Sequence, residues 1–303
     1  MEFIKPGTNF DFVGKMKVAF GISMAMIVIS IASIVWHGGL NYGIDFAGGT
    51  IIQVKFSTPF TIDKIREALR PLGLQGAIIQ EYGQGEILIR IAAGASEPTG
   101  LSDRVAQSLK GALGEKSVEI RRVEMVGPKV GQDLTRKALL AIFFSWVGML
   151  LYIAWRFEFR FGLGAILALV HDTIITVGAF SILNKEFDLT IVAALLTIIG
   201  YSINDTIVVF DRIRENMRKD PKKDLAAVIN ESVNQTLSRT ILTSLTVILV
   251  VVVLFFFGGA VIHDFAFALL VGVTVGTYSS IFIASPLVLV WERYRPTGRK
   301  RKK

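Results

Sequence analysis

The sequence has no cysteine among its 303 residues and only three histidines, His37, His171 and His263. Without cysteine the chain has no disulfide framework, no thiolate nucleophile and no cysteine-based metal site. The histidines belong to different segments and lack the spacing of a metal-binding motif. The sequence also lacks a Walker-type phosphate-binding motif. We therefore expect a protein that is not an enzyme and needs no cofactor, and that takes its energy from an ion gradient or a partner.

Charge is also scarce, because charged residues make up 19% of the chain and hydrophobic residues 52%. The mean hydropathy is +0.54, and the apolar residues come in long blocks. This composition is typical of an integral membrane protein. The net charge of +8 does not favour nucleic acid as a partner, since most Lys and Arg residues flank the apolar blocks, where they determine topology.

Six apolar blocks are long enough to be helical spans. A short N-terminal segment, residues 1–17, precedes them, and a basic tail, residues 291–303, follows them. Residues 37–136 separate the first span from a bundle of five, residues 137–290. We interpret the first span as an uncleaved anchor, because no small-residue cleavage site follows it. The predicted spans are residues 18–36, 138–155, 161–183, 189–210, 240–258 and 265–290.

The distribution of basic residues predicts the orientation in the membrane. The loop after the fourth span and the C-terminal tail are rich in Lys and Arg, whereas the loop after the fifth span has none. Basic loops stay on the cytoplasmic side. Both termini are therefore expected in the cytoplasm, and residues 37–136 on the outer side of the membrane.

Most of that outer segment reads as a soluble α+β domain. Alternating and helical periodicities give the order βαββαβ, which is a ferredoxin-like plan. Gly83-Gln84-Gly85 is expected to turn between the two middle strands, and Ser102 to cap the second helix. The alternation of the last strand slips at Arg121-Arg122, where a β-bulge would restore it.

A glycine-rich connector, residues 39–50, joins the first span to this domain. It contains no Lys-Ser/Thr pair after its glycines, so nucleotide binding is not expected. Glycine permits tight backbone paths, which favours a structural role. The residues to which we assign that role are Gly43, Asp45, Gly48 and Gly49.

Polar residues inside the predicted spans are the candidate functional residues. Asn204 and Asp205 interrupt the fourth span, and an ionised Asp at mid-span costs about 3 kcal/mol. Tyr201 lies one helical turn before Asp205. The alternatives are a proton or ion relay and a purely structural role, in which the pair hydrogen-bonds neighbouring helices.

Arg239 and Asp172 extend this candidate relay. Arg239 begins the fifth span, where a basic residue can simply reach toward lipid headgroups. Because Asp205 lies about 9 Å along its helix from Asp211 at the cytoplasmic end, Arg239 could also reach Asp205 and stabilise its anion. Asp172 lies at mid-span, where desolvation favours its neutral form. We interpret its neighbour His171 as structural.

The motifs of the chain resemble those of the SecF family, the smaller subunits of the SecDF protein-export complex in the RND superfamily. The resemblance covers nearly the whole chain and rests on five stretches: NFDFVGKMK, GIDFAGGT, ALVHDTIITVGAFS, GYSINDTIVVFDRIRENMR and NQTLSRTILTS. It implies assistance to preprotein translocation through the SecYEG channel, driven by the proton motive force. It also implies a proton-conducting role for Asp205 and Arg239, and a less direct one for Asp172.

The same resemblance implies the partners of the chain: SecD, the SecYEG translocon, unfolded preprotein and the lipid bilayer, with YajC and YidC as further candidates. Two other functions remain as alternatives. One is a passive assembly subunit of the translocon, and the other is an RND-type exporter of small molecules. The outer domain is small for an exporter, whose outer domains contain drug pockets.

Overall fold

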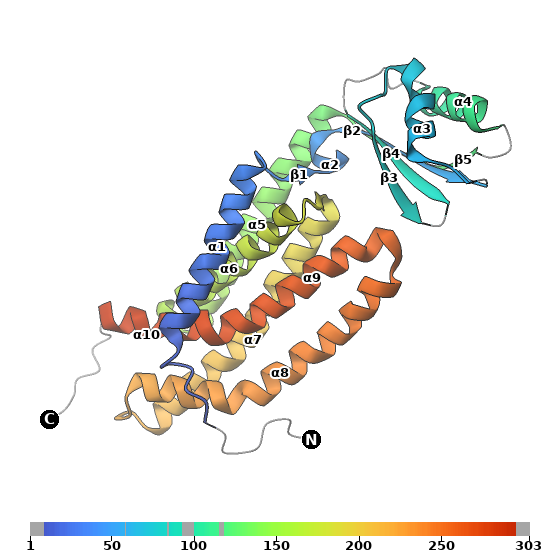
Figure 1. The fold of residues 1–303 in the computed structure, drawn as a ribbon. Helices are drawn as coiled ribbons and strands as arrows, with labels where there is room; N and C mark the ends of the chain where they lie inside the picture. Colours follow the sequence, from blue (N-terminus) through green and yellow to red (C-terminus); the bar gives the residue numbers. More distant parts are fainter. Residues whose placement is uncertain (1–8, 58, 84, 93–99, 115–117, 295–303) are drawn as a thin grey trace. The chain divides into compact units, whose positions relative to one another are not determined.

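The computed structural model describes residues 9–57, 59–83, 85–92, 100–114 and 118–294. The chain divides into two compact units. The helical unit consists of residues 1–41, 140–185 and 190–303, and the sheet unit of residues 42–139 and 186–189. Figure 1 labels most of the elements of both units.

Within the described residues, six helices are long and apolar enough to cross a membrane. The last of these spans is built from three consecutive segments, of which η2 is a π-helical one. The helices are α1 (Met16–Trp36), α5 (Pro128–Arg156), α6 (Phe159–Ile182), α7 (Leu189–Lys219), α8 (Leu225–Phe257) and α9 (Gly259–Ser279), followed by η2 (Ser280–Ala284) and α10 (Ser285–Tyr294).

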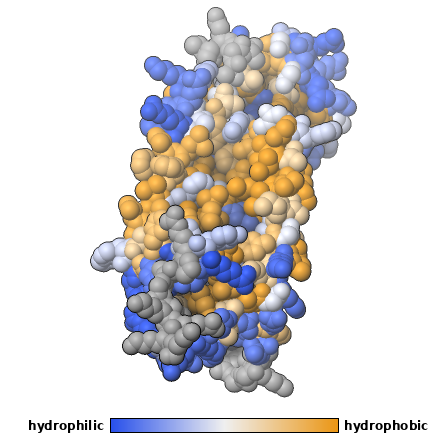
Figure 2. Space-filling view, turned by 90° about the vertical axis from the view of Figure 1, so that its left-hand side faces the viewer, coloured by the Kyte–Doolittle hydropathy of each residue, from blue (hydrophilic) through white to orange (hydrophobic). Residues whose placement is uncertain are grey.

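The helix α6 lies at the centre of the helical unit, because 61% of its apolar window is buried, against 17% for α1 and for α8. Small residues allow neighbouring helices to approach closely, as is usual in membrane bundles. A Cβ atom on Gly178 of α6, for example, would lie 2.0 Å from Ser30 Oγ of α1. The apolar side chains that remain exposed form an extended hydrophobic band on the face displayed in Figure 2. Lipid tails can cover such a surface.

The sheet unit contains a four-stranded antiparallel sheet in the described residues, with strand order β3-β4-β2-β5. Its elements follow one another in the predicted order, strand, helix, two strands, helix, strand. Its core is formed by inward-facing strand residues such as Ile52 and Ile89 together with Ile65 and Val105 of the helices. The elements are β2 (Gly49–Phe56), α3 (Ile62–Leu69), η1 (Arg70–Leu72), β3 (Ile78–Gly83), β4 (Glu86–Ala92), α4 (Leu101–Leu113) and β5 (Val118–Val126).

The structure confirms the predicted bulge in the last strand. Gln53 pairs with Arg122, but the next residue of β2, Val54, pairs with Ile120, so Arg121 is the additional residue. The expected cap of the second helix is wrong, because α4 begins directly after Gly100, which has φ 72°. Ser102 thus lies inside the first turn. Gln84, in the expected turn, lies outside the described residues, as does the basic tail beyond Tyr294.

The connector forms a short helix, α2 (Ile44–Ala47), between β1 (Asn41–Tyr42) and β2. Gly43 and Gly48 flank it. Gly48 has φ 74°, and a Cβ atom there would lie 3.1 Å from the Cα atom of Pro128. Asp45 Oδ2 accepts a hydrogen bond at 3.0 Å from the backbone N–H of Leu189. Leu189 is the first residue of α7. The connector is therefore held by its own backbone geometry and by an exposed hydrogen bond to the start of α7.

Gly49 begins β2 and pairs with Ala92 on one side and Val126 on the other. The strand β6 (Glu186–Phe187) forms a two-stranded sheet with β1. Gly43 N donates to Phe187 O at 2.9 Å. The glycine-rich stretch thus passes directly from a short helix into the central strand of the sheet.

Candidate functional site

Asp172 on α6 is surrounded by hydrogen-bond donors from two other helices. Its carboxylate accepts at Oδ2 from Ser202 Oγ of α7 at 2.7 Å and from Ser279 Oγ of α9 at 2.8 Å. Oδ1 lies 2.9 Å from His171 Nδ1. Asp172 is 1% exposed and His171 4%. We call these four residues the Asp172 cluster, and its carboxylate is fully satisfied by protein groups.

The Asp172 cluster continues toward α1 through an aromatic contact. The ring of His171 stacks on Tyr278 of α9, with centroids 6.3 Å apart and an interplanar angle of 27°. The Tyr278 hydroxyl donates to Ala19 O of α1 at 2.8 Å and lies 3.1 Å from Ser23 Oγ. Asp172 is therefore connected to α1 through the contacts of His171 and Tyr278. His171 faces these neighbours and not lipid, and its Nε2 is buried without a hydrogen-bond partner among the described residues.

Asp205 on α7 has a different environment. Its Oδ1 accepts from Thr240 Oγ1 of α8 at 2.6 Å. Its Oδ2 is buried and has no hydrogen-bond partner in the part of the chain that the structure describes. A buried carboxylate oxygen without a donor is costly, since the group loses its hydration without replacement. Such an oxygen is a chemically reasonable place for a proton to bind.

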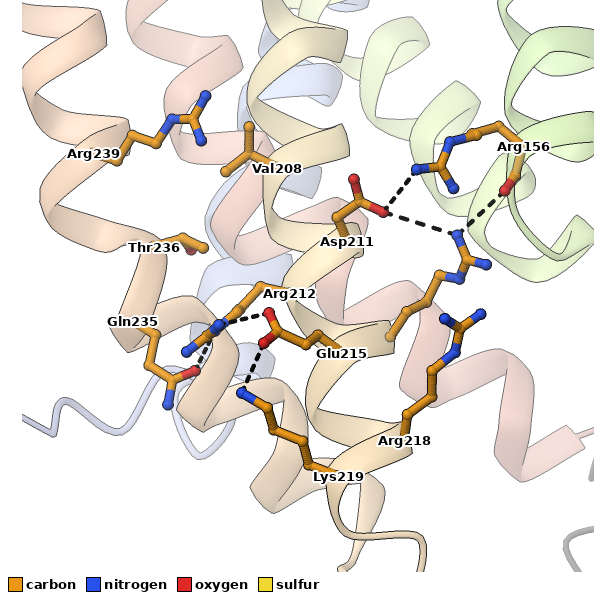
Figure 3. A pocket seen from close by; sticks show the side chains of 11 residues that line it. Arg156, Val208, Asp211, Arg212, Glu215, Arg218, Lys219, Gln235, Thr236 and Arg239 are labelled. Atoms are coloured by element: carbon orange, nitrogen blue, oxygen red, sulfur yellow. Dashed lines mark hydrogen bonds and ion pairs between the residues drawn. The ribbon is translucent and has the colours of Figure 1, made fainter.

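Arg239 lies next to Thr240 in the sequence, but the described residues contain no ion pair between it and Asp205. The side chain is exposed. It extends from α8 toward Val208 of α7, one turn beyond Asp205 (Figure 3). Arg239 is also well inside α8, which begins at Leu225, and not at a helix end. The structure thus places Arg239 near Val208, one turn beyond Asp205. Within the described residues, it does not show the ion pair between Arg239 and Asp205 that the sequence suggested.

Tyr201 and Asn204 have separate surroundings. The Tyr201 hydroxyl donates to Ser244 Oγ of α8 at 3.4 Å, and Ser244 Oγ lies 2.7 Å from Thr277 Oγ1 of α9. Asn204 is exposed on α7, and no hydrogen bond to its side chain is found within the described residues. Tyr201 therefore belongs to the packed interface of α7, α8 and α9, whereas Asn204 faces outward from the helical unit.

Residues of α7 and of α9 with its continuation η2 connect the Asp172 cluster to Asp205. Ser279, which donates to Asp172, precedes Ser280, whose Oγ lies 2.8 Å from Thr206 Oγ1. Thr206 follows Asp205 directly on α7. Ser280 also begins the π-helical segment η2, and such segments occur frequently at functional sites. Hydroxyl groups thus occupy the path from one aspartate to the other.

Comparison with known proteins identifies the chain. The family model described as protein export membrane protein SecD/SecF, C-terminal, matches residues 105–294, which contain Asp172, Asp205 and Arg239. The model described as SecD/SecF GG motif matches residues 34–59, which contain the connector. The protein translocase subunit SecF of Magnetococcus marinus is 52% identical over 296 residues, covering 96% of this chain and 95% of that protein. The chain belongs to the SecF family.

Other comparisons agree with that assignment. The SecF subunit of Vibrio alginolyticus is 50% identical, over 95% of this chain and 91% of that protein. The crystal structure of SecDF, a translocon-associated membrane protein from Thermus thermophilus, superposes with a TM-score of 0.84 at 38% identity. That match covers 95% of this chain but 39% of the SecDF chain. A super-membrane-facing form of SecDF gives a TM-score of 0.72 at 37% identity.

Membership of the SecF family makes this chain a multi-pass membrane protein of Sec-dependent protein translocation. Sequence reasoning found the two aspartates but missed their hydroxyl partners Ser202, Ser279 and Thr240, and it missed Tyr278, which contacts His171. Their signal was present as hydroxyl residues at helical spacing within apolar runs. Serine and threonine are so common in spans that this signal alone does not distinguish a site from ordinary packing.

Proposed function

We propose that the chain is the SecF subunit of a SecD–SecF pair that uses the proton motive force to assist preprotein translocation through the SecYEG channel. The working partners are SecD, SecYEG and unfolded preprotein, with YajC and YidC as additional associates. The protein catalyses no covalent chemistry and needs no cofactor besides the protons that it binds. One observation carries the proposal. The Oδ2 atom of Asp205, on an apolar helix, is buried and has no hydrogen-bond donor among the described residues.

Asp205 is the proton-binding group in this proposal, and Thr240 and Arg239 respond to it. When Asp205 is ionised, it accepts from Thr240, and the neighbouring Arg239 offers a compensating charge. When Asp205 is protonated, it no longer needs either group. The contact between α7 and α8 then has two arrangements of similar energy, which is what a switching element requires.

The energies are of the right size for coupling. Moving one charge through the membrane potential is worth about 2.3 kcal/mol per 100 mV. A typical coupling between two sites amounts to about 1 to 3 kcal/mol. One proton per cycle can therefore shift a two-state arrangement of helices substantially.

Asp172 acts as a second polar centre that carries the change to α1. The supporting contacts are its bonds to Ser202 and Ser279, and the stacking of His171 on Tyr278, which bonds to Ala19 of α1. The helix α1 leads along the chain into the connector. Through that continuity a rearrangement around Asp172 can reach the domain built on β2.

The orientation that we propose places both termini in the cytoplasm of the bacterial inner membrane. The four-stranded domain, ferredoxin-like in its order of elements, then lies in the periplasm. There it supports SecD or contacts the emerging preprotein. The basic α7–α8 loop would remain inside, as the distribution of Lys and Arg predicts.

Proton flux tests the proposal at its centre. The pair of SecD and this chain is reconstituted into liposomes that contain a pH-sensitive dye, and proton entry is followed after a potential is applied. Asp205→Asn should abolish the flux, because an amide cannot bind and release a proton at this position. Asp211→Asn, a matched change on the same helix at an exposed carboxylate, should leave it unchanged. Equal flux in the wild type and Asp205→Asn would contradict the proton-binding role of Asp205.

A further inference from the structure

A strongly basic pocket lies beyond Asp205, at the end of the helical unit that carries the α7–α8 loop. It has a volume of about 960 Å³ and opens between the end of α5, the last turns of α7 and the first half of α8. We call it the basic pocket. The residues that line it are Arg156, Val208, Asp211, Arg212, Arg214, Glu215, Arg218, Lys219, Gln235, Thr236 and Arg239.

The basic pocket has an excess of positive charge that the protein itself does not balance. Six basic side chains line it, against the two carboxylates of Asp211 and Glu215. Asp211 is shared at 3.6 Å by Arg156 and at 3.8 Å by Arg214. These distances are long for ion pairs, so Asp211 neutralises neither arginine fully.

Glu215 is shared in the same way, by Arg212 at 2.6 Å and Lys219 at 2.7 Å. Arg218 and Arg239 have no ion pair within the described residues, although both line the pocket. Figure 3 shows the guanidinium groups of Arg156 and Arg218 on one side of α7 and that of Arg239 on the other side, toward α8. An anion in the pocket would meet guanidinium donors on either side of α7.

The polarity of the walls indicates what kind of anion fits. Among the described residues, no aromatic side chain lines the pocket, so this lining offers no stacking surface for a nucleotide base. Val208 is the apolar residue of the lining, and exposed apolar residues lie close in the sequence to two of the basic lining residues. Trp155, next to Arg156, is 86% exposed, and Ile241, two residues after Arg239, is 37% exposed. A ligand with a negative head and an apolar body would match both surfaces.

We propose that the basic pocket binds the head group of an anionic phospholipid, such as phosphatidylglycerol or cardiolipin. The phosphate group lies in the basic pocket, where the planar guanidinium groups that line it can bind its oxygens in pairs. The acyl chains pass over Val208 toward the exposed apolar residues of the spans. Basic pockets between helices at a membrane surface are suited to such head groups. A zwitterionic lipid fits worse, because its own cation would enter an already positive site.

Lipid binding to the purified full-length chain in mild detergent tests this inference. The probes are dioleoyl-phosphatidylglycerol, dioleoyl-phosphatidylcholine and inorganic phosphate, and bound lipid is counted by native mass spectrometry. We expect retention of phosphatidylglycerol and not of phosphatidylcholine. Inorganic phosphate at millimolar concentration should not displace the lipid, since it lacks the apolar body.

Variants locate the binding site. Arg218→Gln should weaken phosphatidylglycerol binding about five-fold, corresponding to about 1 kcal/mol per basic residue near a membrane surface. Arg212→Gln/Arg218→Gln should weaken it further. The matched control is Lys222→Gln/Lys223→Gln, which removes two positive charges from the adjacent loop, outside the pocket lining. Retained size-exclusion profiles of all variants exclude unfolding as the cause.

Three results would overturn the inference. The first is equal binding of the two lipids, which would leave no preference for an anionic head group. The second is displacement by inorganic phosphate, which would make the pocket a site for a free anion. The third is an equal loss in the loop control, which would reduce the effect to general attraction by a basic surface.

Discussion

Two aspartates lie on adjacent helices of the same bundle, and their carboxylates differ in the groups around them. Asp172 receives hydrogen bonds from Ser202 and Ser279 and contacts His171. Asp205 receives a hydrogen bond from Thr240, with Ser280 and Arg239 also nearby, and its Oδ2 atom is buried without a hydrogen-bond partner among the described residues. This difference supports the proposal that Asp205 carries the exchanging proton.

Thr240→Val tests the hydrogen bond on which Asp205 depends. Valine keeps nearly the volume of threonine but removes the donor to Asp205 Oδ1, a bond to a charged group that is worth about 1.5 to 3 kcal/mol. We expect less gradient-dependent export with normal insertion into the membrane, measured as translocation in membrane vesicles. Thr243→Val is the matched control, because Thr243 is exposed on the same helix. Equal export rates for the two variants would contradict the role of Thr240.

The positions of Asp172 and Asp205 could be predicted from the sequence, but their partners could not. A polar residue in an apolar run is visible in the sequence alone. Which hydroxyl meets which carboxylate depends on how each helix is rotated and crossed. Lipid and bundle interior are equally apolar, so hydropathy does not specify that rotation. For the same reason the expected reach of Arg239 to Asp205 is not matched by an ion pair in the structure.

At the scale of elements, the packing of α9 against α7 and α6 positions the donors of the Asp172 cluster. Gly276 of α9 lies where a Cβ atom would be 3.0 Å from Ser202 Oγ and 3.5 Å from Asp172 Oδ2. Only glycine lets the helices approach closely enough for both serines to reach one carboxylate. Long apolar runs in the sequence indicate the apolar part of these helices. They do not indicate where the helices end, since α8 starts at Leu225, in a polar segment that precedes the apolar run.

Gly276→Ala should disturb this approach. The added methyl group presses on Ser202, and overpacking of this kind costs about 1 to 3 kcal/mol. We expect a lower apparent Tm of the full chain in mild detergent, measured by tryptophan fluorescence. Gly200→Ala is the control, because a Cβ atom at Gly200 of α7 meets nothing within 4 Å. A control variant that loses as much stability as Gly276→Ala would show that the glycine contact is unimportant.

Gly48→Ala tests the connector at the same scale. Gly48 has φ 74°, and its new Cβ atom would lie 3.1 Å from Pro128 Cα and 3.2 Å from Val126 O. Backbone strain of this kind costs about 1 to 3 kcal/mol, and the contact with rigid backbone adds to it. Gly73→Ala, at φ 72° and ψ 16° in the left-handed region with nothing within 4 Å, has a milder backbone strain and no steric contact. The apparent Tm should fall further for Gly48→Ala, and equal decreases would contradict a specific need for glycine at position 48.

At the scale of the whole molecule, the order of elements in both units follows from the sequence. Six apolar blocks and a βαββαβ periodicity are local patterns, and each corresponds to an observed helix or strand. The proposed orientation in the membrane rests instead on the distribution of Lys and Arg between the loops. The chain matches 39% of the SecDF chain at a TM-score of 0.84, so a single SecDF polypeptide contains much that this chain does not.

Cysteine labelling tests the proposed orientation, since the protein has no cysteine of its own. Lys64→Cys lies at an exposed position of α3, and Lys222→Cys at an exposed position of the α7–α8 loop. A membrane-impermeant maleimide added to intact spheroplasts should label the first and not the second. After the membrane is permeabilised, both should react. Labelling of Lys222→Cys in intact spheroplasts would reverse the topology.

The central claim is that Asp205 binds and releases a proton in each cycle of export. Its most direct test is the rate of preprotein translocation in membrane vesicles, with and without a proton gradient, for the wild type and Asp205→Asn. Asparagine keeps the volume and can still accept the bond from Thr240, so a structural role would survive the change. We predict that Asp205→Asn assembles normally with SecD and loses the gradient-dependent increment in rate. Retention of the full increment by Asp205→Asn would contradict the account and make Asp205 a structural residue.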